Sequence, residues 1–119
     1  MLATGQAKQV SQLFKVLGDP FRVQLLLALE KQEACVCHLE CLLRKRQAYI
    51  SQHLMSLRKA GVLKARREGR FVYYSVNNQE LFTLIRKTAE SMGLKNKRVL
   101  SRSQGSLAGC ECPQCGNSI

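Results

Sequence analysis

The sequence predicts a mainly α-helical domain that carries one small β-hairpin. Apolar residues recur at helical spacing through most of the first 92 residues. Two segments with strand-like alternation flank the turn residues Glu68-Gly69-Arg70. Phe, Tyr and Trp make up only 6% of a chain that is 45% hydrophobic, so the core is mostly aliphatic, which suits packed helices. A length of 119 residues fits one small domain.

The first part of the chain predicts three helices with recognisable ends. Leu13 and its apolar neighbours at helical spacing predict a helix over residues 6–17, which Gly18 ends. Asp19 followed by Pro20 is a strong helix-start signal, and it predicts a second, buried helix over Phe21–Gln32 at the centre of the core. A short third helix follows over residues 35–43.

The next part predicts a fourth helix, a hairpin and a last helix. The fourth helix covers Gln47–Ala60 and has its apolar residues at i, i+4 and i+7. Strands are expected over Val62–Arg67 and Phe71–Val76, with Val72, Tyr74 and Val76 on one face. A helix over residues 79–92 ends the periodic sequence. We therefore expect a folded domain over 1–93 and a basic, cysteine-containing tail over 94–119.

The positive charge is concentrated in one segment of the chain. The net charge is +11, and residues 44–70 alone carry nine basic side chains against one acidic side chain. Such a window is the electrostatic footprint of a surface that meets nucleic-acid phosphates. Taken alone, such a run is more often a solvated basic face, so the predicted architecture has to decide between the two.

That architecture is a helix, a basic turn, an amphipathic helix and a hairpin with a basic tip, which together make a winged helix-turn-helix. Its second helix enters the major groove of double-stranded DNA. The predicted base-reading residues are Gln47, Tyr49, Ser51, Gln52 and His53. The predicted phosphate contacts are Arg44, Lys45 and Arg46 in the turn and Arg66, Arg67 and Arg70 in the wing. Taken singly, Tyr49 is as readily a partly buried aromatic residue, and His53 a helix-packing one.

Six cysteines suggest metal or redox chemistry. No segment is long and apolar enough to cross a membrane, and no signal peptide is visible, so we expect a cytoplasmic protein with reduced thiols. Cys35 and Cys37 open the third helix, and Cys41 follows one turn after Cys37. The sulfurs of Cys37 and Cys41, at i and i+4, can share one helix face, and Cys35 can join them if it lies at the frayed N-terminus. Soft ligands of this kind suit As(III), Cd(II), Pb(II), Cu(I) or Zn(II). For one isolated cysteine, a small buried apolar residue is the better interpretation.

The tail contains three more cysteines, at Cys110, Cys112 and Cys115. Cys112-Pro-Gln-Cys115-Gly is similar to a zinc knuckle, in which one turn directs two sulfurs at a metal. These residues either close over Cys35 and Cys37 or form a separate site. The third interpretation is a disordered end with incidental thiols.

Four stretches of the sequence resemble the ArsR/SmtB family of bacterial metal-sensing repressors, in the right order and spacing over roughly residues 8 to 93. The stretches are Phe14–Arg22, Ala34–Leu39, Ile50–Leu63 and Arg67–Tyr74. The resemblance implies a homodimer built on the first and last helices, which binds a palindromic operator and releases it when an inducer binds. Cys35 and Cys37 match the thiolate site of the arsenite and cadmium/lead sensors, whereas the arsenite-sensor pattern places its third cysteine one position before Cys41. The family's other metal site, on the last helix, uses histidine; the last helix here has none, so we expect that site to be absent.

Together these observations predict a DNA-binding repressor that a thiophilic metal or metalloid releases, with no organic cofactor and no enzymatic activity. A repressor that senses oxidants or persulfides through the same cysteines is the main alternative. A thiol-disulfide enzyme is suggested only by Cys112-Pro-Gln-Cys115, which lacks the strand-to-helix setting of such motifs. An architectural DNA binder would leave the cysteines unexplained.

Overall fold

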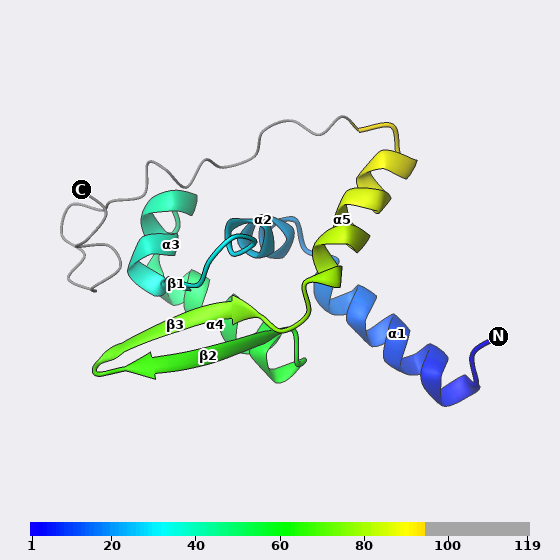
Figure 1. The fold of residues 1–119 in the computed structure, drawn as a ribbon, viewed down its shortest axis with the longest axis horizontal. Coiled ribbons are helices and arrows are strands. Elements are labelled where there is room, and N and C mark those ends of the chain that lie inside the picture. Colours follow the sequence, from blue (N-terminus) through cyan, green and yellow to red (C-terminus); the bar gives the residue numbers. More distant parts are fainter. Residues whose placement is uncertain (95–119) are drawn as a thin grey trace.

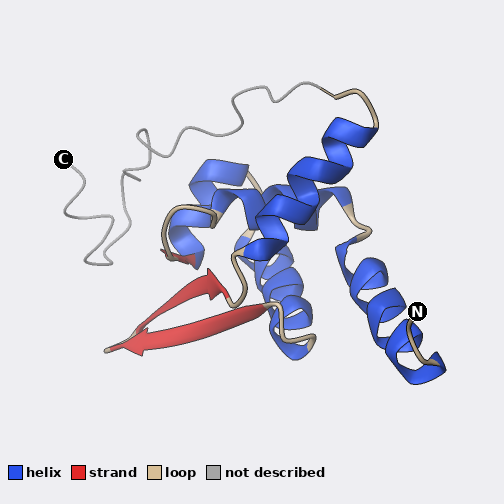
Figure 2. Cartoon of the chain, turned by 45° about the vertical axis from the view of Figure 1, so that its right-hand side comes forward, coloured by secondary structure: helices blue, strands red, loops and turns tan. Residues whose placement is uncertain are grey.

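The structure is a computed structural model that describes residues 1–94. It confirms the predicted fold class: five helices pack together, and a small antiparallel sheet lies at one side of them (Figures 1 and 2). In chain order the elements are α1 (Thr4–Leu17), α2 (Pro20–Ala28), β1 (Ala34–Cys35), α3 (Val36–Leu43), α4 (Gln47–Lys59), β2 (Leu63–Glu68), β3 (Phe71–Val76) and α5 (Glu80–Ser91). Within residues 1–94, no helix has the length and apolar character needed to span a membrane. The rest of the predicted tail, with Cys110, Cys112 and Cys115, lies outside the described residues.

Helix α2 starts as the sequence predicts and ends earlier. The Asp19 carboxylate accepts hydrogen bonds from the backbone N–H groups of Phe21 and Arg22, at 2.8 and 3.3 Å. The expected extension to Gln32 is wrong, because Leu29 and Glu30 donate their N–H groups three residues back, to Leu26 and Leu27. This tighter turn ends the helix and lets the chain reverse toward the sheet.

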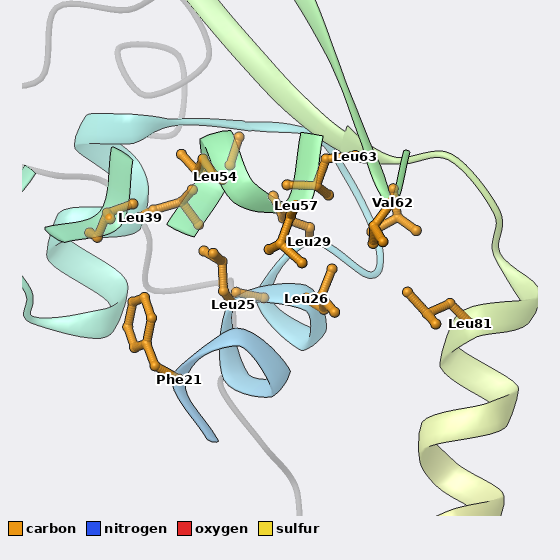
Figure 3. Close-up of a cluster of buried hydrophobic side chains, with 14 of the residues drawn as sticks. Phe21, Leu25, Leu26, Leu29, Leu39, Leu54, Leu57, Val62, Leu63 and Leu81 are labelled. Atoms are coloured by element: carbon orange, nitrogen blue, oxygen red, sulfur yellow. The ribbon is translucent and has the colours of Figure 1, made fainter. Parts of the chain in front are cut away.

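The core forms where α2 packs against α3, α4 and the start of the hairpin. Figure 3 shows Leu25 and Leu26 of α2 facing leucines of α3 and α4. Ile50, Leu54 and Leu57 are the buried residues of α4, and each has no exposed surface. The helix is thus fixed with this face inward, as its i, i+4, i+7 spacing predicts.

The sheet contains one strand that the sequence did not predict. Its order is β1-β3-β2, and β1 pairs with β3 so that Ala34 faces Tyr74 and Cys35 faces Tyr73. Cys35 was expected in the third helix; it is instead extended, as the N-cap residue of α3. The reason is long-range, because the edge of β3 supplies the backbone partners that make residues 34–35 a strand.

The two faces of β3 pack into different clusters. Tyr74 and Val76 contact the main core, in agreement with the predicted face. Tyr73 points to the other side and is fully buried against Cys35, with Cys37 and Phe71 packed around them. The central strand therefore joins the helical core to the segment that carries the cysteine pair.

Helices α1 and α5 keep much of their predicted apolar stripes exposed in the single chain. No residue of α1 is buried, and 56% of Phe14 is accessible. Leu84 of α5 and Met92, the C-cap residue of that helix, are also exposed, Met92 by 68%. These side chains flank a groove of about 330 Å³ between α1 and α5. The domain thus carries an apolar surface on the side opposite the tip of the hairpin (Figure 1).

Candidate DNA interface and thiol site

A tight basic turn joins α3 to α4. Arg44 ends α3 in the left-handed region, at φ 56°, and its N–H donates to the Glu40 carbonyl at 2.8 Å. Arg46 is the extended N-cap residue of α4. The side chains of Arg44, Lys45 and Arg46 are all exposed. Three cations therefore lie at the N-terminus of α4, where the helix dipole also favours an anion such as a phosphate.

The outward face of α4 is the candidate reading surface. Because Ile50, Leu54 and Leu57 point inward, the opposite stripe consists of Ala48, Gln52, Met55 and Lys59, all of them exposed. Gln52, a predicted base-reading residue, lies on this stripe. Sequence reasoning missed Met55, which is 59% exposed beside Gln52. The signal was present, since Met55 is three residues from Gln52 and therefore on the same face.

The other predicted reading residues have different surroundings. Gln47 is exposed in the first turn of α4, and Ser51 is half-buried. The rings of Tyr49 and His53 meet edge to face with centroids 4.6 Å apart, and both rings contact Phe21 of α2, at 4.9 and 5.1 Å. Lys45 lies 5.6 Å from the centre of the Tyr49 ring. Tyr49 and His53 thus pack against the domain at the edge of the reading surface.

The wing is the hairpin of β2 and β3, which projects away from the helices (Figure 2). Its three predicted phosphate contacts, Arg66, Arg67 and Arg70, are exposed. Arg70 lies over the ring of Phe71, with 5.3 Å from guanidinium carbon to ring centre. Gly69 adopts φ +61° between the strands, a conformation that costs glycine little. The wing thus carries its charge near the tip, as the sequence predicts.

Arg66 differs from its neighbours because two carboxylates hold it. Its guanidinium donates to both oxygens of Glu33, at 2.5 and 3.1 Å, and to Glu68 at 3.2 Å. It also lies 4.9 Å from the centre of the Tyr73 ring. Hydrogen bonds to Glu33 and then to Glu68 raise the pKa of Arg66 further above its already high value. The charge of Arg66 is therefore largely compensated within the chain.

The cysteine pair lies behind this contact, at the junction of β1 and α3. The Sγ atoms of Cys35 and Cys37 are 3.0 Å apart. Cys35 is buried and Cys37 is half-buried. Cys35 is the N-cap residue of the eight-residue helix α3, and Cys37 lies in its first turn. The N-terminal end of a helix stabilises negative charge such as that of a thiolate.

Of the remaining predicted thiol ligands, only Cys41 lies within the described residues. Cys41 lies one turn after Cys37 and is exposed. Within residues 1–94, no three Cys, His, Asp or Glu side chains come together in a group that could hold a metal. His38, next to Cys37 in α3, is buried, with only 6% of its surface accessible. Among the described residues, the close contact between thiol ligands is therefore the one between Cys35 and Cys37.

Comparison with known proteins decides the family. Residues 19–65 match the model of bacterial regulatory proteins of the arsR family. The chain is similar to the transcriptional repressor SmtB homolog of Synechocystis, at 36% identity over 77% of this chain and 70% of that protein. The chain belongs to the ArsR family. This ArsR-family chain is also similar to the cadmium resistance regulatory protein CadC homolog of Staphylococcus aureus, at 34% identity over 72% of each chain.

Solved structures agree with the winged helix-turn-helix assignment. The homodimeric winged helix-turn-helix DNA-binding domain of a possible ArsR-family regulator from Mycobacterium bovis superposes with a TM-score of 0.68. It is 25% identical and covers 82% of this chain and 97% of that domain. This ArsR-family chain is therefore a DNA-binding transcriptional regulator, and neither its fold nor its relatives are those of an enzyme.

The compensation of Arg66 generates a prediction for this ArsR-family regulator. The logarithm of DNA affinity falls with the logarithm of salt concentration. Replacing one cation that binds a phosphate reduces the magnitude of this slope by about 0.9. We expect Arg67→Gln to lower the magnitude of the slope by about this amount, because within residues 1–94 the carboxylates of the wing pair with Arg66 and not with Arg67. Arg66→Gln should leave the slope unchanged. Fluorescence anisotropy on one DNA duplex, between about 50 and 200 mM salt, measures both. Equal losses of slope would contradict the compensation.

Proposed function

We propose that the protein is a homodimeric repressor that binds a palindromic operator and is released when Cys35 and Cys37 bind a thiophilic metal or metalloid. The observation that carries this proposal is the position of the sulfur pair. Its sulfurs are 3.0 Å apart at the start of α3, the helix directly before the reading helix. The proposed DNA contacts are the residues predicted from the sequence between Arg44 and His53, together with Arg67 and Arg70 of the wing. Arg66 is left out because Glu33 and Glu68 hold it. We place this activity in the cytoplasm, where thiols are kept reduced.

The chemistry of the pair favours soft ions. Two thiolates suit As(III), Cd(II), Pb(II) or Zn(II) far better than oxygen-seeking ions such as Mg²⁺. A tetrahedral zinc ion with bonds of about 2.3 Å holds its sulfurs about 3.8 Å apart, so the two side chains would have to spread on binding. Further ligands have to come from elsewhere. Cys41, the tail cysteines or a partner subunit are the candidates, and no organic cofactor is required.

Two connections lead from the pair to the DNA-binding surfaces. Helix α3 carries Cys37 and packs against α4, so a shift of α3 on metal binding would misplace the reading helix. Strand β1 carries Cys35 opposite Tyr73, and Glu33, two residues before Cys35, holds Arg66 of the wing. Spreading of the sulfurs would therefore act on both the helix and the wing.

The exposed apolar surface supports the homodimer. Phe14 of α1 and Leu84 and Met92 of α5 lie along one groove. Exposed apolar patches of this kind mark association sites. The occupant we propose is a second copy of this chain, since a related domain with the same fold is homodimeric. Two-fold symmetry would then place two reading helices one DNA turn apart, about 34 Å, on a palindromic site.

Oxidation of the same pair is the second candidate function, and the 3.0 Å separation of the sulfurs favours it as well. Two thiols would form one disulfide by giving two electrons and two protons to a peroxide, which becomes two waters. Release of metal-free protein from its operator by peroxide or polysulfide, but by no metal, would favour this function.

Substitution of both cysteines tests the role of the pair in release from the operator. Wild type should lose operator affinity about 5- to 150-fold when it binds one of As(III), Cd(II), Pb(II), Zn(II) or Cu(I). Cys35→Ser with Cys37→Ser should bind the operator as tightly as wild type and stay bound, because it lacks both sulfurs. Operator titrations with each ion measure this. Release of the double variant at the ion concentrations that release wild type would contradict the assignment of Cys35 and Cys37 as the inducer ligands.

Two further variants separate the other cysteines. Cys41→Ser is the matched control, and we expect it to weaken metal affinity far less than either substitution in the pair, because Cys41 is exposed and joins no three-residue group in the described chain. Substituting Ser at 110, 112 and 115 tests the tail. Unchanged metal stoichiometry and affinity in that variant would exclude the tail as a source of ligands.

The dimer has its own test. Phe14→Glu places a charge in the α1–α5 groove and should produce a monomer with strongly reduced operator affinity. Gln12→Glu adds the same charge to the same helix at an exposed position outside the groove, and it should remain dimeric. Light scattering after gel filtration measures the molecular mass of both variants. A dimeric Phe14→Glu protein, or equal dissociation of both variants, would contradict the proposed interface.

The wing connection predicts a loss of coupling. Glu33→Gln removes the contact between the Cys35 segment and Arg66, so metal should weaken operator binding about 5-fold less than in wild type. Glu68→Gln removes a carboxylate that also holds Arg66 but lies within the wing, and it should keep full release. For each protein, the measurement is the ratio of operator affinity without Cd(II) to operator affinity with saturating Cd(II). Equal ratios for Glu33→Gln and wild type would exclude this connection.

A further inference from the structure

One arginine side chain joins three helices next to the reading surface. Arg22, in the first turn of α2, donates from Nε to Nδ1 of His53 on α4, at 3.0 Å. Its Nη1 donates to the carbonyl oxygen of Val16 in α1, also at 3.0 Å. His53 and Arg22 are 31 residues apart in the sequence, and both are half-buried. The guanidinium thus ties the reading helix to α1.

This contact determines the hydrogen-bonding character of His53. Arginine has only donors, so the Nδ1 atom that faces it has to present a lone pair. A neutral imidazole with a lone pair on Nδ1 carries its proton on Nε2. The ring is also held between Phe21 and Tyr49, with centroids at 5.1 and 4.6 Å. His53 is therefore fixed in orientation, with an N–H group as its remaining polar atom.

We propose that Arg22 is a positioning residue for DNA binding, which holds His53 as a neutral Nε2–H donor to a phosphate oxygen of the operator. His53 follows Gln52 by one position, so it lies on the flank of α4 rather than on its outward stripe. The flank of a helix in the major groove faces the DNA backbone, which favours a phosphate over a base edge. The inference rests on DNA binding and is independent of the thiol site.

The second bond of Arg22 adds a consequence for the dimer. Because Nη1 is bonded to Val16 of α1, the orientation of His53 depends on the position of α1. Helix α1 also carries the exposed Phe14 of the proposed interface. Arg22 therefore links the arrangement of the two subunits to a contact on the DNA backbone.

The tautomer gives a direct spectroscopic test. The chain has two histidines, so ¹⁵N–¹H spectra of the imidazole rings resolve His53 from His38 with one assignment variant. We expect His53 of wild type as the Nε2–H tautomer. In Arg22→Lys, which keeps the charge and loses the planar fork, a mixture of tautomers should appear. An Nδ1–H ring in wild type, or an unchanged spectrum in Arg22→Lys, would overturn the proposal.

Operator binding supplies the functional test. His53→Asn keeps an acceptor near Nδ1 and removes the outer N–H, so affinity should fall about 5- to 10-fold. The salt dependence should stay the same, because a neutral donor releases no counterion. Arg22→Lys should lower operator affinity by a similar factor. The variant that combines Arg22→Lys and His53→Asn should bind the operator at most about 2-fold more weakly than the weaker-binding single variant. Additive losses, or a salt slope smaller by about 0.9 in His53→Asn, would refute the proposal.

Lys31→Gln is the charge control, since Lys31 is exposed and touches none of these groups. It should bind the operator like wild type. Circular dichroism and gel filtration establish that each variant is folded and has the mass of wild type. If Arg22→Lys does not fold, the wild-type tautomer and the affinity of His53→Asn still decide the outcome.

Discussion

The burial of one face of α4 is the constraint on which the DNA-binding surface depends. Ile50, Leu54 and Leu57 have no exposed surface, and their packing against α2 fixes the rotation of the helix about its axis. Burying three such side chains contributes several kcal/mol, roughly 2 each, which is far more than any single surface contact can oppose. The outward stripe with Gln52 and Met55 follows from that rotation. The basic turn directly precedes this helix in the chain, and the wing directly follows it.

The same packing brings the thiol site close to the surface it is proposed to control. Helix α3 is only eight residues long, with the cysteine pair at one end and the basic turn at the other. Strand β1 puts Cys35 beside Tyr73, which is fully buried in the sheet that continues into the wing. A movement of the two sulfurs thus meets close-packed neighbours rather than solvent, and such packing transmits displacement well. Little structure lies between the proposed inducer site and DNA.

Charge compensation divides the basic segment into parts with different roles. The sequence shows nine cations between residues 44 and 70, without distinguishing among them. In the structure Arg44, Lys45 and Arg46 are exposed around a helix N-terminus, whereas Arg66 is held by Glu33 and Glu68. Arg22, outside the basic segment, bonds a residue of the reading helix. A basic side chain can therefore contact DNA, fasten the wing or orient another residue, and only its partners tell which.

The sequence by itself determined the features that depend on near neighbours. The Asp19-Pro20 helix start, the buried face of α4, the basic turn and the hairpin are all set by residues within a few positions of one another, so their patterns predict them. Tertiary structure decided the early end of α2, strand β1 and the burial of His38. It also decided the pairings of Arg66 with Glu33, 33 residues apart, and of Arg22 with His53, 31 residues apart. These contacts join segments that only chain folding brings together, and no local spacing encodes which distant donor meets which acceptor.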